Sequence, residues 1–230
     1  MHHHFNPSNN WTDTLTAIGT LLAVLTTVFF FLYERIKNYL NRPILRIDIN
    51  LTPPECHKTT ALSNQKLYSA FWFRLFVKND GKSNATNLEV IIEKVDKLVD
   101  GKWKTFSGFL PSNLVWTHIN KSNLKHLLPG TTKNVDLGYI LDPAGRVSNP
   151  AERNLEHTIS MTDNVFRVNI SIQPFNAYNI IEPGDYLFHI IAGASNSEAC
   201  REKFHLSFNK DWTQDESKML SEIVSIKKEK

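Results

Sequence analysis

Three consecutive residues, Gly81-Lys82-Ser83, match the end of the phosphate-binding loop found in many ATPases and GTPases. That loop has the spacing G-x-x-x-x-G-K-S/T, and it lies between a strand and a helix whose N-terminus faces the phosphates. The residue five positions before Gly81 is Phe76 rather than glycine, and the residues after Ser83 alternate like a strand. We therefore predict no nucleotide site, but a tight turn at Asp80-Gly81 with a positive φ at Gly81.

Thiols and imidazoles are the next groups that could bind a metal or act in nucleophilic catalysis. The spacings typical of metal sites, C-x₂-C and H-x₃-H, do not occur among Cys56, His57, Cys200 and His205. Cys56 and His57 are neighbours on one extended segment, so their side chains point to opposite faces and cannot act as nucleophile and base. The sequence therefore predicts no metal, no cofactor and no catalytic residue.

Two long segments keep one enzymatic alternative open. Residues 109–128 and 142–164 are rich in Asn, Ser, Pro and His, and connections of that length usually carry function or short elements of their own. A hydrolase with a site built from these loops would bring His118, His126 or His157 beside a carboxylate. We retain this hydrolase as the second alternative to a protein without enzymatic activity.

Aromatic residues at outward positions indicate a binding surface. In residues 69–79 four apolar side chains share one face, so Trp72 and Phe76 lie on the opposite face; Trp103 and Trp116 add two further indoles. Only one face of a strand meets the core between two sheets, so Trp72 and Phe76 need another cover. A long loop or the C-terminal helix could supply it, and so could a protein partner. The candidate interaction surface comprises Trp72, Phe76, Trp103 and Trp116.

Apolar and polar residues alternate with a period of two through most of the chain. Seven segments show this pattern, with an eighth around 102–106: residues 44–51, 69–79, 88–93, 135–141, 166–172, 185–193 and 203–208. Half-buried strands joined by Pro-Gly turns are typical of antiparallel sheets. We predict an all-β fold over residues 41–210, an antiparallel β-sandwich of seven to eight strands.

Part of this region also resembles a known family. The pattern F-x-V-x-N-x-G-x-x-x-A-x-x-x-x-V is matched, with leucine at its first position, by Leu75, Val77, Asn79, Gly81, Ala85 and Val90. In these residues the chain resembles bacterial immunoglobulin-like domains of the kind named for cell-adhesion-related repeats. Residues 183–186, PGDY, resemble the entry to a penultimate strand of such domains. The resemblance implies an immunoglobulin-like sandwich in which the Tyr186 ring closes a corner of the core, and it implies no activity.

Residues 211–230 are predicted to form a short amphipathic helix and a basic tail. Thr213 and Glu216 have the spacing of a capping box. Apolar residues follow at helical spacing: Met219, Leu220, Ile223, Val224 and Ile226. This stripe could pack on the core of the domain or dock on a partner, and packing is the commoner use of such stripes.

Near the N-terminus, residues 15–33 contain no charged side chain. About 20 apolar residues cross the hydrocarbon core of a bilayer as a helix. We predict a short tail over residues 1–13 and a transmembrane helix with a juxtamembrane extension over residues 14–40. Its membrane-spanning residues include Leu15, Ile18, Leu22, Leu25, Phe29 and Leu32. A buried core helix would usually have a polar face, and a cleaved signal peptide would usually have a basic N-terminus.

The charges beside this segment predict its orientation. No lysine or arginine precedes it, whereas Arg35, Lys37, Arg42 and Arg46 follow it. Such basic residues stay on the cytoplasmic side. We therefore predict a single-pass protein of the cell membrane, with the N-terminus outside and the C-terminal domain in the cytoplasm. Two cysteines in 230 residues are too few for a disulfide framework, although one Cys56–Cys200 bridge stays possible.

These observations favour a membrane-anchored binding or regulatory module, an accessory subunit of a membrane-associated complex. Its partners would be the lipid bilayer and an unidentified protein. The net charge of +3 without a basic, aromatic-rich stripe predicts no nucleic acid as partner. An outward-facing adhesion or envelope domain is the first alternative, suggested by the family resemblance, and would require the domain to cross against four flanking basic residues.

Overall fold

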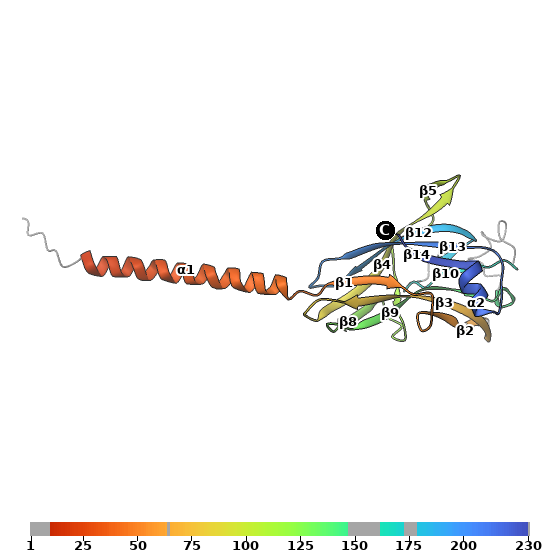
Figure 1. The fold of residues 1–230 in the computed structure, drawn as a ribbon, viewed down its shortest axis with the longest axis horizontal. Coiled ribbons are helices and arrows are strands. Elements are labelled where there is room, and N and C mark those ends of the chain that lie inside the picture. The colour runs from red at the N-terminus through yellow and green to blue at the C-terminus, as the bar shows by residue number, and fades with distance from the viewer. Residues whose placement is uncertain (1–9, 64, 147–161, 173–178, 230) are drawn as a thin grey trace, which may run out of the picture. The chain divides into compact units, whose positions relative to one another are not determined.

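The computed structural model describes residues 10–63, 65–146, 162–172 and 179–229, and the chain divides into two compact units, Met1–Arg42 and Pro43–Lys230 (Figure 1). The first unit contains one helix, α1 (Asn10–Leu40), and the second contains the strands. The predicted organisation, an N-terminal apolar helix followed by antiparallel β-structure and a short C-terminal helix, is confirmed at this level.

Helix α1 is long and apolar enough to span a membrane, and none of its most apolar window is buried within the chain. Three of its threonine hydroxyls are satisfied within the helix, because Thr16, Thr20 and Thr27 each donate to the carbonyl oxygen four residues earlier. The predicted membrane-spanning residues all present their side chains outward, with between 49% and 64% exposed: Leu15, Ile18, Leu22, Leu25, Phe29 and Leu32. The apolar segment of the helix therefore exposes hydrophobic side chains all around its circumference.

The second unit is built from two antiparallel sheets, which we call sheet A and sheet B. Sheet A has the order β1-β3-β9-β10-β11, with β2 also paired to β3 and β7 to β9. Its strands are β1 (Leu45–Ile49), β2 (Cys56–Ser63), β3 (Lys66–Asn79), β7 (Val115–Trp116), β9 (Thr132–Leu141), β10 (Phe166–Val168) and β11 (Ile180–Ile181). The long strand β3 is paired along one edge by β2 and β1 in succession, and along the other by β9.

Sheet B has the order β14-β13-β12-β4-β5, and its long strand β4 also pairs with β6 and β8. Its strands are β4 (Ala85–Val99), β5 (Lys102–Thr105), β6 (Ser112–Asn113), β8 (Asn123–Leu127), β12 (Gly184–Gly193), β13 (Cys200–Phe208) and β14 (Val224–Lys228). Buried apolar residues of both sheets belong to one continuous core, which includes Phe73 and Leu75 of sheet A and Phe188 and Phe204 of sheet B.

Each sheet contains a bulge that shifts the alternation of inward and outward residues. In the pair β3–β9 the shift falls between Phe73 and Arg74, where Phe73 pairs with Gly138 and Arg74 with Asp136. Leu137 is the extra residue, so both Leu137 and Gly138 are buried opposite one partner. A Cβ on Gly138 would lie 2.4 Å from the Phe166 ring, which explains glycine here. The alternation of residues 135–141 predicts Tyr139 inward with Val135, Leu137 and Leu141. This is wrong at Tyr139, which lies on the outer face, and Ile140 is buried in its place, whereas Leu141 is buried as predicted.

All eight predicted segments contain strands, but the described chain has fourteen strands rather than seven to eight. The residues of β2, CHKTTALS, and of β8, NLKHL, are mostly polar, because each lies at an edge of its sheet and only one or two of its residues face the core. Residues 109–128, predicted to be a long connection, contain β6, β7 and β8. In residues 142–164 the structure describes a short 3₁₀ turn at Pro143–Gly145, and residues 147–161 lie outside the described residues.

The loop after β3 is held by Asn79 and not by a glycine turn. Asn79 is fully buried, and its carboxamide Oδ1 accepts from the backbone N–H of Ile44 (3.2 Å) and of Gly81 (3.0 Å). Its Nδ2 donates to the carbonyl oxygens of Ser83 (2.8 Å) and Leu127 (3.0 Å). One side chain thus joins the start of β1, the β3–β4 loop and the end of β8.

The predicted positive φ at Gly81 is wrong. The glycines of the described chain with left-handed φ near +70° are Gly101 and Gly130. The side chain of Asn79 hydrogen-bonds to the backbone N–H of Gly81 two residues later, and this Asx-type contact turns the chain without a left-handed residue at Gly81.

The C-terminal segment also differs from its prediction. The helix α2 (Glu216–Lys218) is capped by Asp215, whose side chain accepts from the Lys218 N–H, and not by Thr213. One π-helical turn follows at Met219–Ile223, and the chain then becomes β14. Met219, Ile223, Val224 and Ile226 are buried in the core, so the apolar stripe packs on the domain; its second half has the period of a strand.

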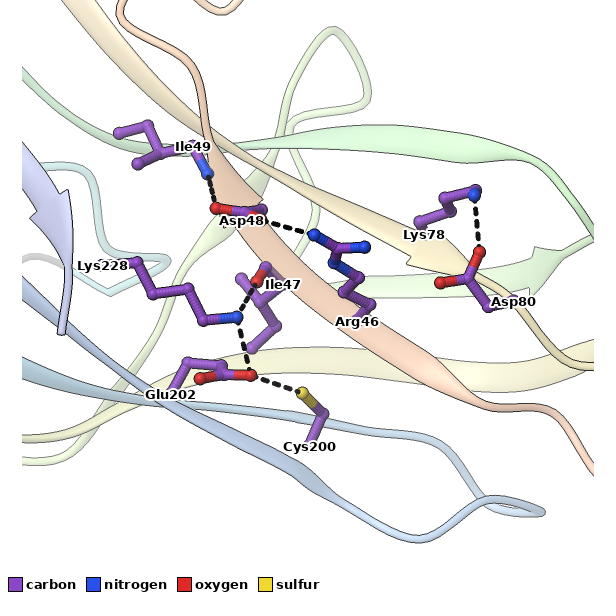
Figure 2. Close-up of polar contacts among 9 residues, drawn as sticks. All are labelled: Arg46, Ile47, Asp48, Ile49, Lys78, Asp80, Cys200, Glu202 and Lys228. Atoms are coloured by element: carbon purple, nitrogen blue, oxygen red, sulfur yellow. Dashed lines mark hydrogen bonds and ion pairs between the residues drawn. The ribbon is translucent and has the colours of Figure 1, made fainter. Parts of the chain in front are cut away.

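Lys227 and Lys228 of the predicted basic tail belong to this strand, and Lys228 connects the two sheets (Figure 2). Its Nζ lies 2.8 Å from Glu202 Oε1 on β13 and donates to the carbonyl oxygen of Ile47 on β1 at 3.1 Å. The thiol of Cys200 lies 3.8 Å from the same Glu202 oxygen. Lys228 therefore satisfies a carbonyl on the unpaired edge of β1 and neutralises a partly buried carboxylate.

Replacing Asn79 by alanine removes four hydrogen bonds from a buried site. Two N–H groups and two carbonyls lose their partner, and each unsatisfied buried group costs about 1–3 kcal/mol, less where water can enter. We expect the free energy of unfolding to fall by about 2–4 kcal/mol. The measurement is urea unfolding of the full chain in detergent micelles, followed by tryptophan fluorescence.

Asn134→Ala is the matched control. Asn134 is a half-buried asparagine on the neighbouring strand β9, and its change should stay within about 0.5 kcal/mol. Similar effects of the two substitutions would contradict the central role of Asn79.

Candidate functional site

The outer face of sheet A carries an aromatic and cationic surface. Alternation along β3 places Trp72, Arg74 and Phe76 on this face, while Phe73 and Leu75 between them are fully buried. Trp72 stacks on Tyr139 of β9, with ring centroids 4.6 Å apart and an interplanar angle of 26°. We call Trp72, Arg74, Phe76 and Tyr139 the sheet A surface. Its three rings are half-buried, so they are held by their neighbours and still reach solvent.

An ion pair between Arg74 and Asp136 anchors the sheet A surface to the strands that carry it. The Arg74 Nε lies 3.0 Å from Asp136 Oδ1, and both side chains are nearly buried. Asp136 also accepts from Thr117 Oγ1 at 2.7 Å and from Asn169 Nδ2 at 3.3 Å. Each oxygen of the carboxylate therefore has a donor, as a buried charge requires.

The other end of Arg74 holds the segment that leads into β2. Arg74 Nη1 donates to the carbonyl oxygen of Pro54 at 3.1 Å and lies 3.2 Å from His57 Nδ1. The guanidinium carbon is 5.8 Å from the Trp72 ring centroid, within the range of a cation–π contact. The ion pair thus orders the backbone segment before β2 and the Trp72 ring beside it.

The four aromatic residues predicted as one candidate surface do not lie together. Trp72 and Phe76 are outward on β3 of sheet A, and Trp103 is 42% exposed on β5 of sheet B, edge-on to His205 at 5.4 Å. Trp116 is buried, with 1% exposed, and its indole N–H donates to the carbonyl oxygen of Ser122 at 3.1 Å. The assignment of Trp116 to a surface is therefore wrong, because β7 pairs with β9 and places the indole in the core.

Tyr139, Arg74 and Asp136 were missed by sequence reasoning. Tyr139 was expected inward because the period of two was carried through residues 135–141, whereas the bulge at Leu137 turns it outward. Arg74 and Asp136 are far apart in the chain, and only the pairing of β3 with β9 brings them together. The usable signal was local: Arg74 stands between two outward aromatic residues on a predicted strand.

A second polar cluster lies on the outer face of sheet B. His189 Nε2 is 2.8 Å from Asp96 Oδ2, and Asp96 also contacts Lys94 Nζ and Thr105 Oγ1, each at 3.1 Å. Burial acts to raise the pKa of Asp96, but hydrogen bonds from Lys94, His189 and Thr105 outweigh it and hold the pKa below its ordinary value. A groove of about 300 Å³ adjoins His189. Its rim mixes Arg201 and Lys203 with Glu93 and Glu229, so it matches neither an anion nor a cation.

The groups that a metal or nucleophile would need are dispersed. Among the residues that the structure describes, no three His, Cys, Asp or Glu side chains could hold a metal ion. Both thiols are free, and burial raises the pKa of Cys56 to about 11, so it is a protonated core residue at neutral pH. Burial is also the largest cause that raises the pKa of Cys200.

The histidines of the long loops do not form a catalytic group in the described chain. His118 and His126 are exposed, and the contact that the structure gives His126 is with the Asn84 amide at 3.4 Å. His157 lies outside the described residues. After Gly81-Lys82-Ser83 the chain enters β4, so a strand occupies the position where a phosphate-binding loop needs a helix.

Compared with known proteins, the sequence matches no family model and none of the curated proteins. The sheet A surface is therefore the candidate site on the strength of its geometry and chemistry.

Tyr186 on β12 is the clearest buried group without a polar role. It is fully buried, and its hydroxyl has no hydrogen-bond partner among the described residues. Burial, together with the charges of Glu182 and Asp185, raises its pKa above the ordinary value of a tyrosine. Its ring packs on Phe106 and Phe208. The ring therefore stabilises the core, and the hydroxyl does not.

We expect Tyr186→Phe to leave the free energy of unfolding unchanged or to raise it by up to about 1 kcal/mol, because it removes an unsatisfied buried hydroxyl. Tyr186→Ala should lower it by about 3–5 kcal/mol through the lost ring. Thermal and urea unfolding of the full chain measure both. A loss of more than about 1 kcal/mol in Tyr186→Phe would mean that the hydroxyl has a partner, as in the tyrosine corner of immunoglobulin domains.

Proposed function

We propose that this chain is a single-pass membrane protein whose β domain binds a protein partner or regulates a membrane-associated complex. The observation that carries the proposal is helix α1, a candidate span at Trp11–Leu40 with no part of its apolar window buried in the chain. A helix that is apolar on all sides and uncovered by protein has a favourable environment in a bilayer.

The orientation follows from charge. Arg35, Lys37 and Arg42 follow the apolar segment and no basic residue precedes it, which favours an outside N-terminus and a cytoplasmic domain. The two unpaired thiols suit a reducing compartment. The outward-facing adhesion domain is less well supported, since the Cys56–Cys200 bridge that would favour it is not formed.

The β domain is proposed to be an immunoglobulin-like sandwich. Two antiparallel sheets share one core, and five residues of the matched pattern are fully buried, which supports this fold: Leu75, Val77, Asn79, Ala85 and Val90. The unpartnered hydroxyl of Tyr186 departs from the corner that the resemblance implies. Such a fold hosts many activities, so the function must come from its surfaces.

The sheet A surface is the proposed binding surface for the protein partner. Trp72 and Phe76 flank Arg74 along β3, and Tyr139 stacks on Trp72. Aromatic residues and arginine are the types enriched at the centres of protein interfaces. Trp72 is restrained by its stacking on Tyr139, and Arg74 by its ion pair with Asp136. Less side-chain entropy is then lost on binding.

A reporter fused after Lys230 tests the orientation in a bacterial host. We expect a fluorescent protein at this position to fluoresce and alkaline phosphatase to be inactive, because both report a cytoplasmic C-terminus. As a control, replacement of Arg35, Lys37 and Arg42 by glutamine, with two lysines added before residue 10, should invert both signals. Active phosphatase on the unaltered chain would contradict the proposed orientation.

Trp72→Ala and Phe76→Ala test the binding surface. Crosslinking in native membranes, followed by purification of the full chain, should give a defined partner band that falls at least tenfold in either variant, since central aromatic residues contribute about 2 kcal/mol or more. Trp103→Ala is the matched control, an exposed tryptophan on the other sheet, and should leave the band unchanged. Equal bands in all four proteins would contradict the assignment of the partner to the sheet A surface.

A further inference from the structure

The three loops joined by Asn79 form one end of the β domain, which we call the Asn79 end. It comprises residues 43–44 before β1, the β3–β4 loop at residues 80–84 and the β8–β9 turn at residues 128–131. The Asn79 side chain bonds the first two directly and reaches Leu127 beside the third. Its backbone carbonyl also accepts from the Gly130 N–H at 2.8 Å. These loops are thus held together as one surface.

Two apolar side chains project from this surface. Ile44 is 54% exposed and Leu128 is 58% exposed. Their backbones are fixed, because Ile44 accepts from the Asp80 N–H at 2.8 Å and Leu128 from the Thr131 N–H at 3.2 Å. Single exposed apolar residues are ordinary on protein surfaces, so the pair needs its charged surroundings to indicate a partner.

The surroundings are basic. Lys82 lies in the β3–β4 loop, Lys125 on β8 and Lys133 at the start of β9, and all three are exposed. The carboxylate of Asp80 in the same loop is neutralised by Lys78, with Nζ and Oδ1 at 2.6 Å (Figure 2). Glu198 lies in the neighbouring β12–β13 loop, and Glu89 of β4 accepts from the amide of Asn123, two residues from Lys125, so four lysines stand against three carboxylates. An excess of lysines around two exposed apolar side chains fits an anionic, partly apolar surface such as a bilayer with acidic headgroups.

The domain is also tethered at this end. The chain enters it at Pro43, and only Asn41, Arg42 and Pro43 separate Ile44 from the last helical residue, Leu40. A short tether gives the Asn79 end a high effective concentration at any bilayer that α1 crosses. Even weak attraction then suffices for docking.

We propose that the Asn79 end docks on the anionic leaflet of the bilayer, with Leu128 and Ile44 at the boundary of headgroups and acyl chains and with Lys82, Lys125 and Lys133 on the acidic headgroups. This inference rests on the proposed membrane anchoring. It adds that the domain is held in one orientation on the membrane. The sheet A surface then faces along the bilayer plane, where a membrane-associated partner can reach it.

An environment-sensitive fluorophore at Leu128→Cys tests the docking in the full chain. The background is Cys200→Ser, since Cys56 is buried with a raised pKa and does not react. The protein is reconstituted into vesicles of phosphatidylcholine alone, or of equimolar phosphatidylcholine and phosphatidylglycerol, that contain lipids with a nitroxide near the headgroup. We expect the label to be quenched strongly in the anionic vesicles and weakly in the neutral ones.

The matched control is a label at Leu62→Cys, on the β2–β3 hairpin. Leu62 is 72% exposed, and its partner Leu67 lies twelve residues from Asn79 along β3, roughly 40 Å at ~3.3 Å per residue. This label should not be quenched. In the Leu128→Cys protein, Lys82→Gln and Lys133→Gln should each lower the ratio of docked to undocked domain by about fivefold. Both lysines are exposed, so folding should be unaffected.

The outcomes separate the inference from the anchoring on which it rests. Release of the protein by alkaline carbonate would overturn the proposed anchoring itself. A carbonate-resistant protein whose Leu128 label is no more quenched than the Leu62 label would overturn the docking and leave the anchoring intact. Quenching that is equally strong in neutral vesicles, or unchanged by the lysine substitutions, would overturn the assignment of an anionic surface.

Discussion

The buried carboxamide of Asn79 is the interaction on which one end of the β domain depends. Strand ends leave backbone N–H and C=O groups without ladder partners, and when these groups are buried they must be satisfied by something else. A carboxamide offers an acceptor with two lone pairs and an NH₂ group with two donors, and here all four capacities are used. Aspartate has no donor, and glutamine carries the same groups on a longer stem. The residues joined belong to both sheets, so one side chain fixes the spacing between them.

The remaining polar groups of the core are also structural. The pair Arg74–Asp136 satisfies a carbonyl of the segment before β2 and the hydroxyl of Thr117, and Lys228 satisfies the edge of β1. The pKa values of Cys56 and Tyr186 are strongly raised because burial penalises the charged forms of both side chains. Neither side chain lies in a cleft beside a base. What distinguishes the domain is the character of its surfaces: an aromatic face on sheet A, a mixed polar face on sheet B and a basic end at Asn79.

Strands with a long, regular alternation of apolar and polar residues could be predicted from the sequence. The structure shows why the other strands could not. Central strands such as β3 meet the core along their length, so their alternation is long and regular, and Trp72 and Phe76 could be assigned outward from it. Edge strands such as β2 and β14 bury few residues, and the two buried residues of β14, Val224 and Ile226, continue a helical spacing by coincidence. The bulge at Leu137 cannot be seen without the partner strand, which is why Tyr139 was assigned to the wrong face. Asn79 was recognised as part of a pattern, but two of its four partners, Ile44 and Leu127, come from segments 35 and 48 residues away in the chain.

The link between Lys228 and Ile47 has a consequence for how the protein is made. The first strand of the domain and the last are 181 residues apart in the chain, and their contact joins sheet A to sheet B. Synthesis proceeds from the N-terminus, so β1 leaves the ribosome long before β14 exists. Until β14 is available, sheet B lacks its edge strand, and Phe204 and Leu206 lack the cover of Val224 and Ile226 on their core side. The nascent domain therefore remains open until β14 has left the ribosome, and contacts of such long sequence separation are slow to form.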